Sequence, residues 1–225
     1  MKHVAIIPAR NGSKSIVNKN LQKLRGKSLV QLAIDSALEC GKFAEVVVTT
    51  DIPVLMDELS MRKEITLINR DPALCTDASL MSNTVLDVLY RTQYSHEDFL
   101  WLLQPTSPFR LKSDYEEIDK IIFRHKPASV ISVRSIGGEH PDRCYTNIRG
   151  QLKPLRYTNF ENRQSLKSVY IRNGCFYVCK VGTFKATHTF HIDPCMSYEM
   201  PDERSVNIDG PLDLMLAKAL VKGAA

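Results

Sequence analysis

Residues 4–13 of the chain, VAIIPARNGS, place a short apolar run directly before a polar loop. A continuous apolar run of this length is typical of a strand that is buried on both faces. The loop gathers basic side chains around two small residues, namely Arg10, Lys14, Lys19, Gly12 and Ser13. Such a loop is unsuited to a core and well suited to an anion. Because ligands of open α/β sheets bind beyond the carboxyl ends of the strands, the stretch predicts such a sheet with an anion site at its edge.

The same kind of apolar run recurs along the chain, at residues 45–50, 65–68, 99–104, 128–133 and 175–181. Helical periodicity occupies the intervals, at residues 28–40, 79–90, 113–125 and 211–221. This alternation predicts an α/β fold, a Rossmann-like and mainly parallel sheet flanked by helices. The length of 225 residues fits one domain over residues 1–225.

Residues 136–172 interrupt the alternation with a polar, basic segment that is too aromatic for a linker. Its aromatic side chains are Tyr145, Tyr157, Phe160 and Tyr170. We expect a small antiparallel insert with a turn at Arg149-Gly150. It either covers the site or docks on a second subunit.

The composition limits the partners of the chain. The net charge of +5 is only mildly basic, and no basic block is interleaved with aromatic residues, so we expect no nucleic-acid partner. No apolar stretch approaches the roughly 20 residues that span a bilayer, and the N-terminus does not resemble a signal peptide. These features predict a soluble, cytoplasmic protein without a membrane partner.

The cysteines predict reduced, buried thiols. The six residues Cys40, Cys75, Cys144, Cys175, Cys179 and Cys195 contain no C-x-x-C pair. Cys175 and Cys179 share one predicted strand, where four residues span about 13 Å, which is too far for a disulfide. The histidines do not pair with other ligands at zinc-site spacing.

The opening loop does not match the two most familiar phosphate-binding motifs. A P-loop would need a glycine where Ile7 stands, and no G-x-G-x-x-G occurs. Gly12 would instead let the loop amides curl into an anion-binding concavity, with the basic side chains as charged donors. A solvated basic turn is the alternative.

Residues 8–20, PARNGSKSIVNKN, closely resemble the nucleotide-binding loop of CMP-sialic acid synthetases, or acylneuraminate cytidylyltransferases. This family includes CMP-legionaminic and CMP-pseudaminic acid synthetases, and its usual form is P-A-R-x-G-S-K-x-I-P-x-K-N. Val17 replaces the common proline. The resemblance implies a nucleotide-diphospho-sugar transferase-like fold. It also implies that the loop holds the triphosphate of CTP through Ala9, Arg10, Asn11, Gly12, Ser13, Lys14, Lys19 and Asn20.

Residues 68–81, INRDPALCTDASLM, form the second block. By itself the block predicts a turn after Arg70, and capping of the next helix by the stretch from Asp77 to Ser79. The family carries an Arg followed by D-x-S here. The resemblance implies that Arg70 and Ser79 contact the cytidine, with Asp77 near them, while Met81 replaces a serine of some relatives.

Residues 102–110, LLQPTSPFR, end a predicted strand with polar side chains between two prolines that fix the backbone. A plain strand-to-helix loop is the alternative. Q-P-T-S-P is also a family motif. The resemblance implies that Gln104 and Thr106 bind the nucleotide, and that Gln104 and Ser107 contact the sugar.

Residues 160–178, FENRQSLKSVYIRNGCFYV, would read alone as a solvated cationic hairpin. They match the family pattern of R-Q followed by Y-x-x-N-G-x-x-Y. The resemblance implies that Arg163 binds the carboxylate of an acidic sugar, because its planar fork fits both oxygens. It also implies sugar contacts from Gln164, Tyr170 and Asn173, and a place for this segment at or near a homodimer interface.

A histidine-proline pair, His140-Pro141, also resembles the family. Arg143 lies close to this pair in the sequence. The resemblance suggests that Arg143 takes the place of a sugar-binding lysine.

Residues 205–216, SVNIDGPLDLML, predict a strand followed by a helix, so Asn207 and Asp209 should share one face. Two oxygen ligands on one face can hold a divalent cation near phosphates. Relatives often carry D-x-D here. We therefore expect Mg²⁺ or Mn²⁺ to depend mainly on Asp209, with the uncharged Asn207 as a second ligand, and Asp213 to belong to the first turn of the helix.

The five blocks occur in family order and imply a cytidylyltransferase with CTP and an acidic sugar as its partners. The anomeric hydroxyl of a nine-carbon sugar, such as sialic, legionaminic or pseudaminic acid, would attack the α-phosphorus of CTP and release pyrophosphate. Alignment and charge neutralisation would dominate catalysis. The residues expected to carry it are Arg10, Lys14, Lys19, Arg163 and Asp209.

Other functions remain open at this stage. A CMP-Kdo synthetase is one, although that family has a different first loop, and a guanylyl- or uridylyltransferase acting on a sugar 1-phosphate is another. A non-catalytic nucleotide-binding module is the third. Its support is Asn207, which stands where relatives carry the first aspartate.

Overall fold

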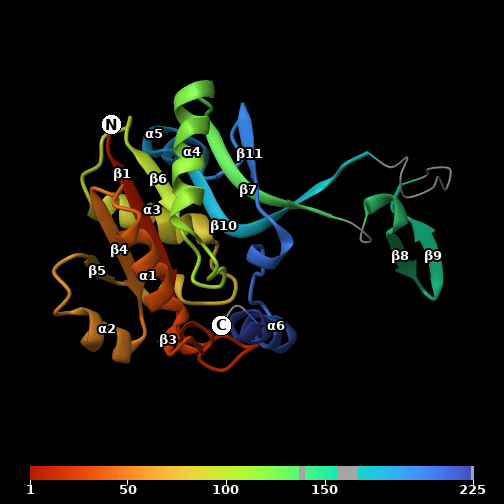
Figure 1. Ribbon diagram of the computed structural model, residues 1–225, viewed down its shortest axis with the longest axis horizontal. Helices are drawn as coiled ribbons and strands as arrows, with labels where there is room; N and C mark the ends of the chain where they lie inside the picture. The colour runs from red at the N-terminus through yellow and green to blue at the C-terminus, as the bar shows by residue number, and fades with distance from the viewer. Residues whose placement is uncertain (137–139, 157–166, 224–225) are drawn as a thin grey trace.

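The computed structural model describes residues 1–136, 140–156 and 167–223. Its centre is a seven-stranded sheet with the strand order β11-β7-β10-β6-β1-β4-β5. Helices cover both faces of this sheet (Figure 1). The predicted α/β fold, a mainly parallel sheet flanked by helices, is confirmed.

The sheet and two small hairpins use the strands β1 His3–Ala9, β2 Lys23–Leu24, β3 Lys27–Ser28, β4 Glu45–Thr50, β5 Thr66–Asn69, β6 Phe99–Leu102, β7 Ser129–Ser135, β8 Tyr145–Ile148, β9 Gln151–Pro154, β10 Tyr170–Lys180 and β11 Cys195–Glu199. The helices are α1 Leu29–Glu39, α2 Pro53–Leu59, α3 Met81–Arg91, α4 Lys112–His125, α5 Val181–Thr187 and α6 Pro211–Gly223. Short 3₁₀ turns include η1 Lys19–Leu21, η2 Pro72–Leu74, η3 Pro141–Arg143 and η5 Asp202–Arg204. Of the helices, α2 and α5 were not predicted from the sequence, and neither were β2, β3 and β11.

Alternation along the strands divides the core into two layers. Ala5 and Ile7 of β1 pack with α1, α2 and α4, whereas Val4 and Ile6 pack with α3 and α5. Both faces of β1 are therefore buried, which explains its uninterrupted apolar run. A third cluster joins Ile16 and Ile208 to α6, and so holds the C-terminal helix close to the opening loop.

One strand of the sheet runs against the others. β10 pairs antiparallel with both β6 and β7, while β1 is parallel to its neighbours β4 and β6. The register of β10 against β7 shifts between Arg172 and Tyr177. Gly174, with φ of +79°, lies inside this irregular stretch and supplies a backbone conformation that other residues rarely adopt.

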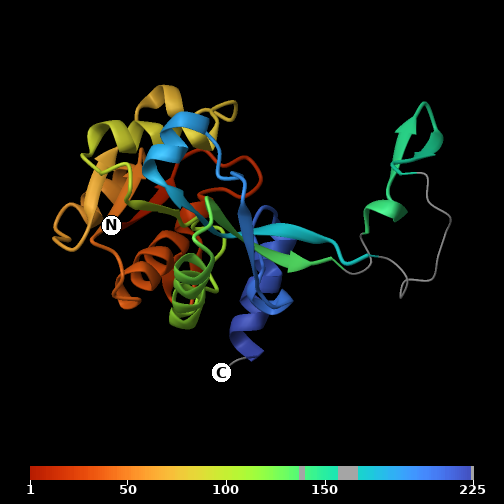
Figure 2. The same ribbon diagram turned by 90° about the horizontal axis from the view of Figure 1, so that it is seen from above.

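The predicted insert contains an antiparallel hairpin of β8 and β9 that projects from the body of the molecule (Figures 1 and 2). Its turn lies at Arg149 and Gly150, as predicted, and both have positive φ. Pairing of β10 with β7 extends as far as Tyr170 and Ser135. The last residues of the predicted insert, 170–172, therefore belong to the central sheet.

The strand predicted at residues 205–209 is not formed, and this stretch has no regular secondary structure. A main-chain hydrogen bond of 2.8 Å, from the amide of Ile208 to the carbonyl oxygen of Thr106, ties this stretch to the loop after β6. Among the described helices, none is long and apolar enough to cross a membrane.

Candidate active site

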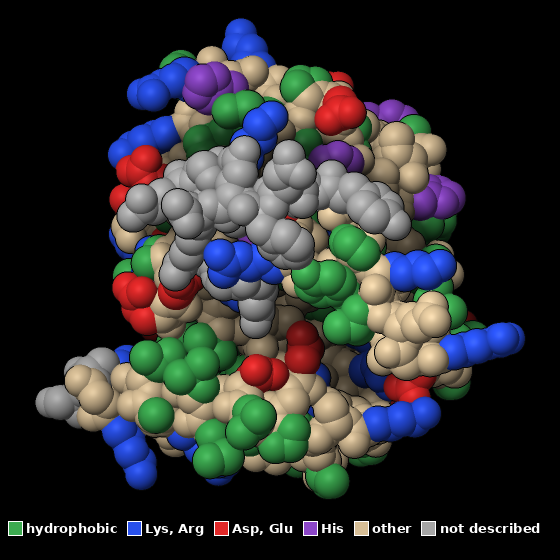
Figure 3. All heavy atoms as spheres, turned by 90° about the vertical axis from the view of Figure 1, so that its right-hand side faces the viewer, with side chains coloured by type: hydrophobic (Ala, Val, Ile, Leu, Met, Phe, Trp, Pro, Cys, Tyr) green, Lys and Arg blue, Asp and Glu red, His purple; other side chains and the backbone are tan. Residues whose placement is uncertain are grey.

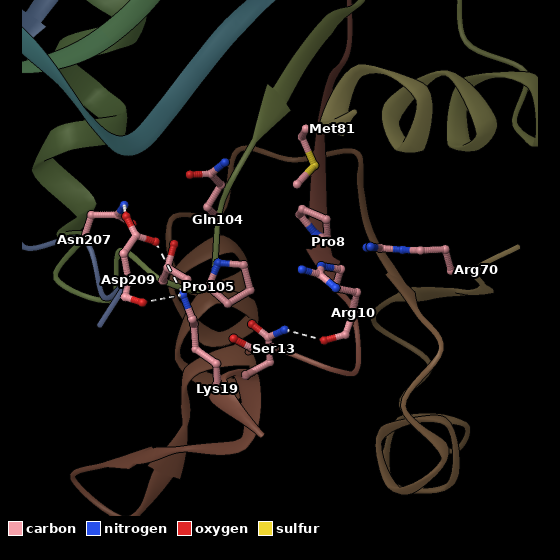
Figure 4. Close-up of a pocket in the computed structure, with 12 residues that line it drawn as sticks. Pro8, Arg10, Ser13, Lys19, Arg70, Met81, Gln104, Pro105, Asn207 and Asp209 are labelled. Carbon is pink, nitrogen blue, oxygen red and sulfur yellow. Dashed lines mark hydrogen bonds and ion pairs between the residues drawn. The ribbon is translucent and has the colours of Figure 1, made fainter. Parts of the chain in front are cut away.

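A cavity of about 400 Å³ opens at the carboxyl ends of β1 and β6 (Figure 4). Four of the five predicted blocks contribute to its wall, which is formed by Pro8, Arg10, Ser13, Lys19, Asn20, Arg70, Met81, Gln104, Pro105, Thr106, Asn207 and Asp209. These segments are distant in the sequence and adjacent in space because parallel strands present their carboxyl ends at one edge of the sheet. The structure thus brings most of the predicted nucleotide-binding residues to one site.

The opening loop is held by its own side chains. Asn20 is buried and donates to the carbonyl oxygen of Arg10 at 2.9 Å, which ties the end of the loop to its beginning. The amide of Asn11 donates to Asp51 at 2.7 Å, and the amide of Gly12 donates to the side chain of Asn11 at 2.9 Å. Two of the amides predicted to bind an anion are therefore used within the protein.

Asp77 joins two cations of the opening loop. Arg10 donates to Oδ1 of Asp77 at 2.6 Å, and the ammonium of Lys14 lies 2.7 Å from Oδ2. Arg10 also donates to the carbonyl oxygen of Cys75 at 3.2 Å. Lys14 and then Arg10 lower the pKa of the Asp77 carboxyl, because both favour its charged form.

Arg70 is the most deeply buried cation in the wall of the cavity, with 3% of its surface exposed. Its Nη2 donates to the carbonyl oxygen of Thr49 at 2.9 Å. Its Nε has no hydrogen-bond partner within the described part of the chain. Burial lowers the pKa of this guanidinium. A buried cation with an unused donor favours an anionic or strongly polar ligand in the cavity.

The Gln104 and Ser107 side chains meet the bulge of β10. A Cβ on Gly174 would lie 2.8 Å from the Ser107 hydroxyl and 3.0 Å from the Gln104 side-chain oxygen. The Ser107 hydroxyl lies 3.2 Å from the carbonyl oxygen of Asn173 and 3.3 Å from the side-chain oxygen of Asn207. The absence of a side chain at Gly174 therefore allows three predicted blocks to converge.

Asn173 is buried and its amide is used inside the protein. The amide oxygen accepts from the Ser132 hydroxyl at 2.6 Å, and the amide nitrogen donates to Ser205 at 2.9 Å. These bonds fix the strand next to the cavity. A direct contact between Asn173 and a sugar stays a prediction.

The wall of the cavity opposite Arg70 is formed by Lys19, Asn207 and Asp209 (Figure 4). The Lys19 ammonium lies 3.4 Å from Oδ1 of Asp209, and the Asn207 amide nitrogen donates to Oδ2 at 2.5 Å. The prediction that Asn207 and Asp209 point the same way is thus correct, although no strand carries them. Asp213 accepts from the amides of Asp209 and Gly210 in the first turn of α6, as expected.

Capping of α3 by residues 77–79 was predicted and is wrong. The N-cap residue is Leu80, which makes no side-chain cap. The Ser79 hydroxyl instead donates to the carbonyl oxygen of Ala73 at 2.8 Å. The Asp77 carboxylate forms ion pairs with Arg10 and Lys14. Ser79 is not among the residues of the cavity wall, whereas Met81 is.

Tyr170 and Arg143, two of the predicted sugar-binding residues, are not among the residues of the cavity wall. Arg163 and Gln164 fall outside the described residues. Tyr170 is exposed at the start of β10, and Arg143 is exposed in η3 near the hairpin. Their proposed roles stay predictions.

Asp51 supports the opening loop and was not predicted from the sequence. It directly follows β4, at the same edge of the sheet as the loop after β1, and it accepts from the amide of Asn11. An acidic residue at the carboxyl end of a predicted parallel strand was the available signal. Pro8 and Pro105 were read as backbone features, and both also line the cavity.

The six cysteines are free thiols. Cys40, Cys175 and Cys179 are buried as predicted, while Cys75, Cys144 and Cys195 are only partly buried. Among the described residues, no group of three His, Cys, Asp or Glu side chains could hold a metal ion.

Comparison with known proteins identifies relatives of this chain. A family model described as cytidylyltransferase matches residues 4–173. The N-acylneuraminate cytidylyltransferase of Streptococcus agalactiae is 29% identical over 214 residues, which are 93% of this chain and 51% of the relative. The chain therefore spans about half the length of that relative. The CMP-N,N'-diacetyllegionaminic acid synthase of Legionella pneumophila is 32% identical over 229 residues, 99% of this chain and 97% of the relative.

Among solved structures, CMP:2-keto-3-deoxy-manno-octonic acid synthetase complexed with CTP has a similar fold, with a TM-score of 0.71. It is 17% identical to this chain, and the match covers 100% of both. At this identity the likeness concerns the fold alone.

Proposed function

Because the chain belongs to the cytidylyltransferase family, we propose that it activates an acidic nine-carbon sugar with CTP, giving the CMP-sugar and pyrophosphate. One observation carries the proposal. A single cavity is lined by the basic opening loop, by the buried Arg70 and by Asp209, which are the groups that a nucleoside triphosphate would need. Neutralising the charge of the phosphates and aligning the attacking hydroxyl are the main tasks in such a transfer.

In this proposal, two groups of residues would bind different parts of the nucleotide. Arg10, Lys14 and Lys19 would bind the phosphates, and Arg10 and Lys14 would stabilise the departing pyrophosphate as its charge develops. Arg70 would bind the nucleoside end, because its free Nε is buried on the β4 side of the cavity. Gln104 would lie between nucleotide and sugar, at the point where β6 approaches the bulge of β10.

Asp209 is the residue that fits a divalent cation. Its carboxylate is 70% exposed and lines the cavity, and Mg²⁺ in phosphate sites is often held by one or two carboxylates plus the phosphates. Mg²⁺ or Mn²⁺ bound there would supply charge neutralisation at the phosphates. The amide nitrogen of Asn207 faces Asp209, so Asn207 could ligate through oxygen only after its amide turned. Lys19 and Asn207 thus orient the Asp209 carboxylate.

N,N'-diacetyllegionaminic acid is the first sugar to test, since the Legionella relative is named for it and is covered over nearly its whole length. The experiment measures pyrophosphate release with each of the four nucleoside triphosphates and with sialic, legionaminic, pseudaminic and 3-deoxy-octulosonic acids. We expect release with CTP and one of the nine-carbon sugars. Asp209→Asn should retain the fold, by its melting temperature, and lose release.

Two other results would replace this function. Release with the eight-carbon acid alone would make the chain a CMP-Kdo synthetase. Binding of CTP without release in the presence of any sugar would leave a nucleotide-binding module.

We also propose that the protein is a homodimer built on the β8–β9 hairpin. The hairpin exposes apolar side chains, with Leu152 64% and Ile148 50% exposed. A two-stranded hairpin is marginally stable by itself, so a covering surface would stabilise it. Figure 3 views the molecule from the side on which this hairpin projects, and it shows further hydrophobic side chains along the lower edge, where Figure 1 places α6. Leu212 and Met215 of α6 are exposed.

Light scattering of the purified chain tests the assembly. We expect twice the monomer mass, and Leu152→Asp should shift the protein toward monomer. Leu111→Asp, at an exposed leucine before α4, is the control and should leave the mass unchanged. A monomeric wild-type chain would refute the dimer.

A further inference from the structure

Asp77 forms ion pairs with Arg10 and Lys14, the two cations that the proposed function assigns to the departing pyrophosphate. Its two carboxylate oxygens lie on different partners, Oδ1 at 2.6 Å from Arg10 and Oδ2 at 2.7 Å from Lys14. A carboxylate that bridges two cations in this way uses the same charge-assisted donors as a phosphate oxygen pair would use. The nucleotide-free protein therefore already holds an anion at this position, supplied by its own chain.

The pairing is open to exchange. The Asp77 side chain is 42% exposed and that of Lys14 is 84% exposed. Exposed ion pairs contribute little to stability because water and salt compensate for their loss. A polyphosphate carries several negative charges, so it would outcompete one carboxylate for the same cations.

The segment that carries Asp77 lies between η2 and α3 and is tied to the opening loop through Arg10. The same guanidinium that binds Asp77 also donates to the carbonyl oxygen of Cys75. Asp77 would stay close to Arg10 after a phosphate had replaced it, because the Cys75 contact does not use the carboxylate. It could therefore return as soon as the phosphates left.

We propose that Asp77 is an internal competitor for pyrophosphate, which exchanges with the phosphates on Arg10 and Lys14 and promotes their release. The inference rests on the proposed function, since it assigns these two cations to the leaving group. In this role Asp77 lowers the affinity for ligands that carry β- and γ-phosphates and leaves the affinity for CMP unchanged. No covalent step is involved.

The test is calorimetric titration of inorganic pyrophosphate, CTP and CMP into the wild-type protein, Asp77→Asn and Asp77→Ser. Each of the two lost ion pairs should count for a few-fold in affinity, so we expect pyrophosphate and CTP to bind about two- to tenfold more tightly to both variants. CMP should bind equally to all three proteins. Pyrophosphate should also inhibit turnover at correspondingly lower concentration in the variants.

Asp57→Asn is the matched control. Asp57 is an exposed residue of α2, and its replacement changes the net charge by the same amount without touching the opening loop. It should leave the three affinities unchanged. An equal gain in pyrophosphate affinity for Asp57→Asn would mean that net charge alone is responsible and would overturn the inference.

Two other outcomes separate this inference from the proposed function. If the wild-type protein releases pyrophosphate from CTP while both Asp77 variants bind pyrophosphate equally or more weakly, Asp77 acts by orienting Arg10 and the competitor role is wrong. If the wild-type protein binds neither CTP nor pyrophosphate, the assignment of the cations fails and the inference falls with it.

Discussion

Arg110 donates from Nη2 to the main-chain carbonyl oxygen of Gln104 at 2.8 Å. The same guanidinium donates from Nε to the carbonyl oxygen of Cys175, also at 2.8 Å, and lies over the ring of Phe176. Arg110 is buried. It therefore clamps the loop after β6 to the bulge of β10, the two segments that meet where Gln104 approaches Gly174.

Replacing Arg110 by lysine should loosen this clamp. Lysine keeps the charge, but its single ammonium cannot reproduce the two fixed directions of the guanidinium. We expect Arg110→Lys to lower the free energy of unfolding by about 1.5–3 kcal/mol, the range for one hydrogen bond from a charged donor. Urea unfolding measures the change. Arg124→Lys, at an exposed position near the end of α4, is the control and should alter stability by less than about 0.5 kcal/mol.

Gly174→Ala should impair both stability and transfer. The positive φ strains any other residue by about 1–2 kcal/mol, and the new methyl group would displace the Ser107 hydroxyl or the Gln104 oxygen. Gly41→Ala is the matched control, because Gly41 has φ of +70° and open space around it. Both variants should lose stability in thermal unfolding, but only Gly174→Ala should also lower kcat/KM. An equal loss of activity in the two variants would show that the close approach of Ser107 and Gln104 to Gly174 does not affect transfer.

Arg10→Ala should slow transfer without unfolding the protein. If Arg10 stabilises the charge on the departing pyrophosphate, its loss should lower turnover about a hundredfold or more, as for one preorganised donor. Steady-state kinetics at saturating CTP give the value. Unchanged turnover would show that Arg10 does not act on the leaving group.

Cys75 should react slowly with alkylating agents at neutral pH. Burial, and then the neighbouring Asp51 carboxylate, raises the pKa of its thiol to about 11, since both disfavour the thiolate. At pH near 8 only about one molecule in a thousand would carry the reactive thiolate. The alkylation rate at this site, followed by peptide mass, should keep rising up to about pH 11. A plateau near pH 9, as in an unfolded chain, would contradict the raised pKa.

The framework of the site followed from the sequence because it depends on local patterns. The short apolar run before Arg10 is typical of a buried strand, and a parallel sheet places the carboxyl ends of such strands at one edge. Gln104 after β6 and Arg10 after β1 were therefore predictable neighbours. The place of Asp209 beside them was predicted from the resemblance to a family.

The features of the fold and the site that the sequence did not predict depend on contacts between distant segments. Nothing in the local sequence of Asp77 distinguishes a helix cap from a partner for Arg10 and Lys14, because both uses need the same carboxylate. The stretch around Asn207 is tied to Thr106 by a hydrogen bond from the amide of Ile208 and not by strand pairing. The antiparallel direction of β10 is likewise visible only in its pairing with β6 and β7, which periodicity does not encode.

The place of β10 between β6 and β7 also determines when the central sheet can be completed during synthesis on the ribosome. β6 ends at Leu102, yet the strand that covers its outer edge is β10, which ends at Lys180. Until that later segment emerges, the nascent chain presents β6 as an open edge, and β7 has no sheet to join. Open edges invite pairing with other chains, so the interval between the two strands is the stage of synthesis at which a chaperone would matter most.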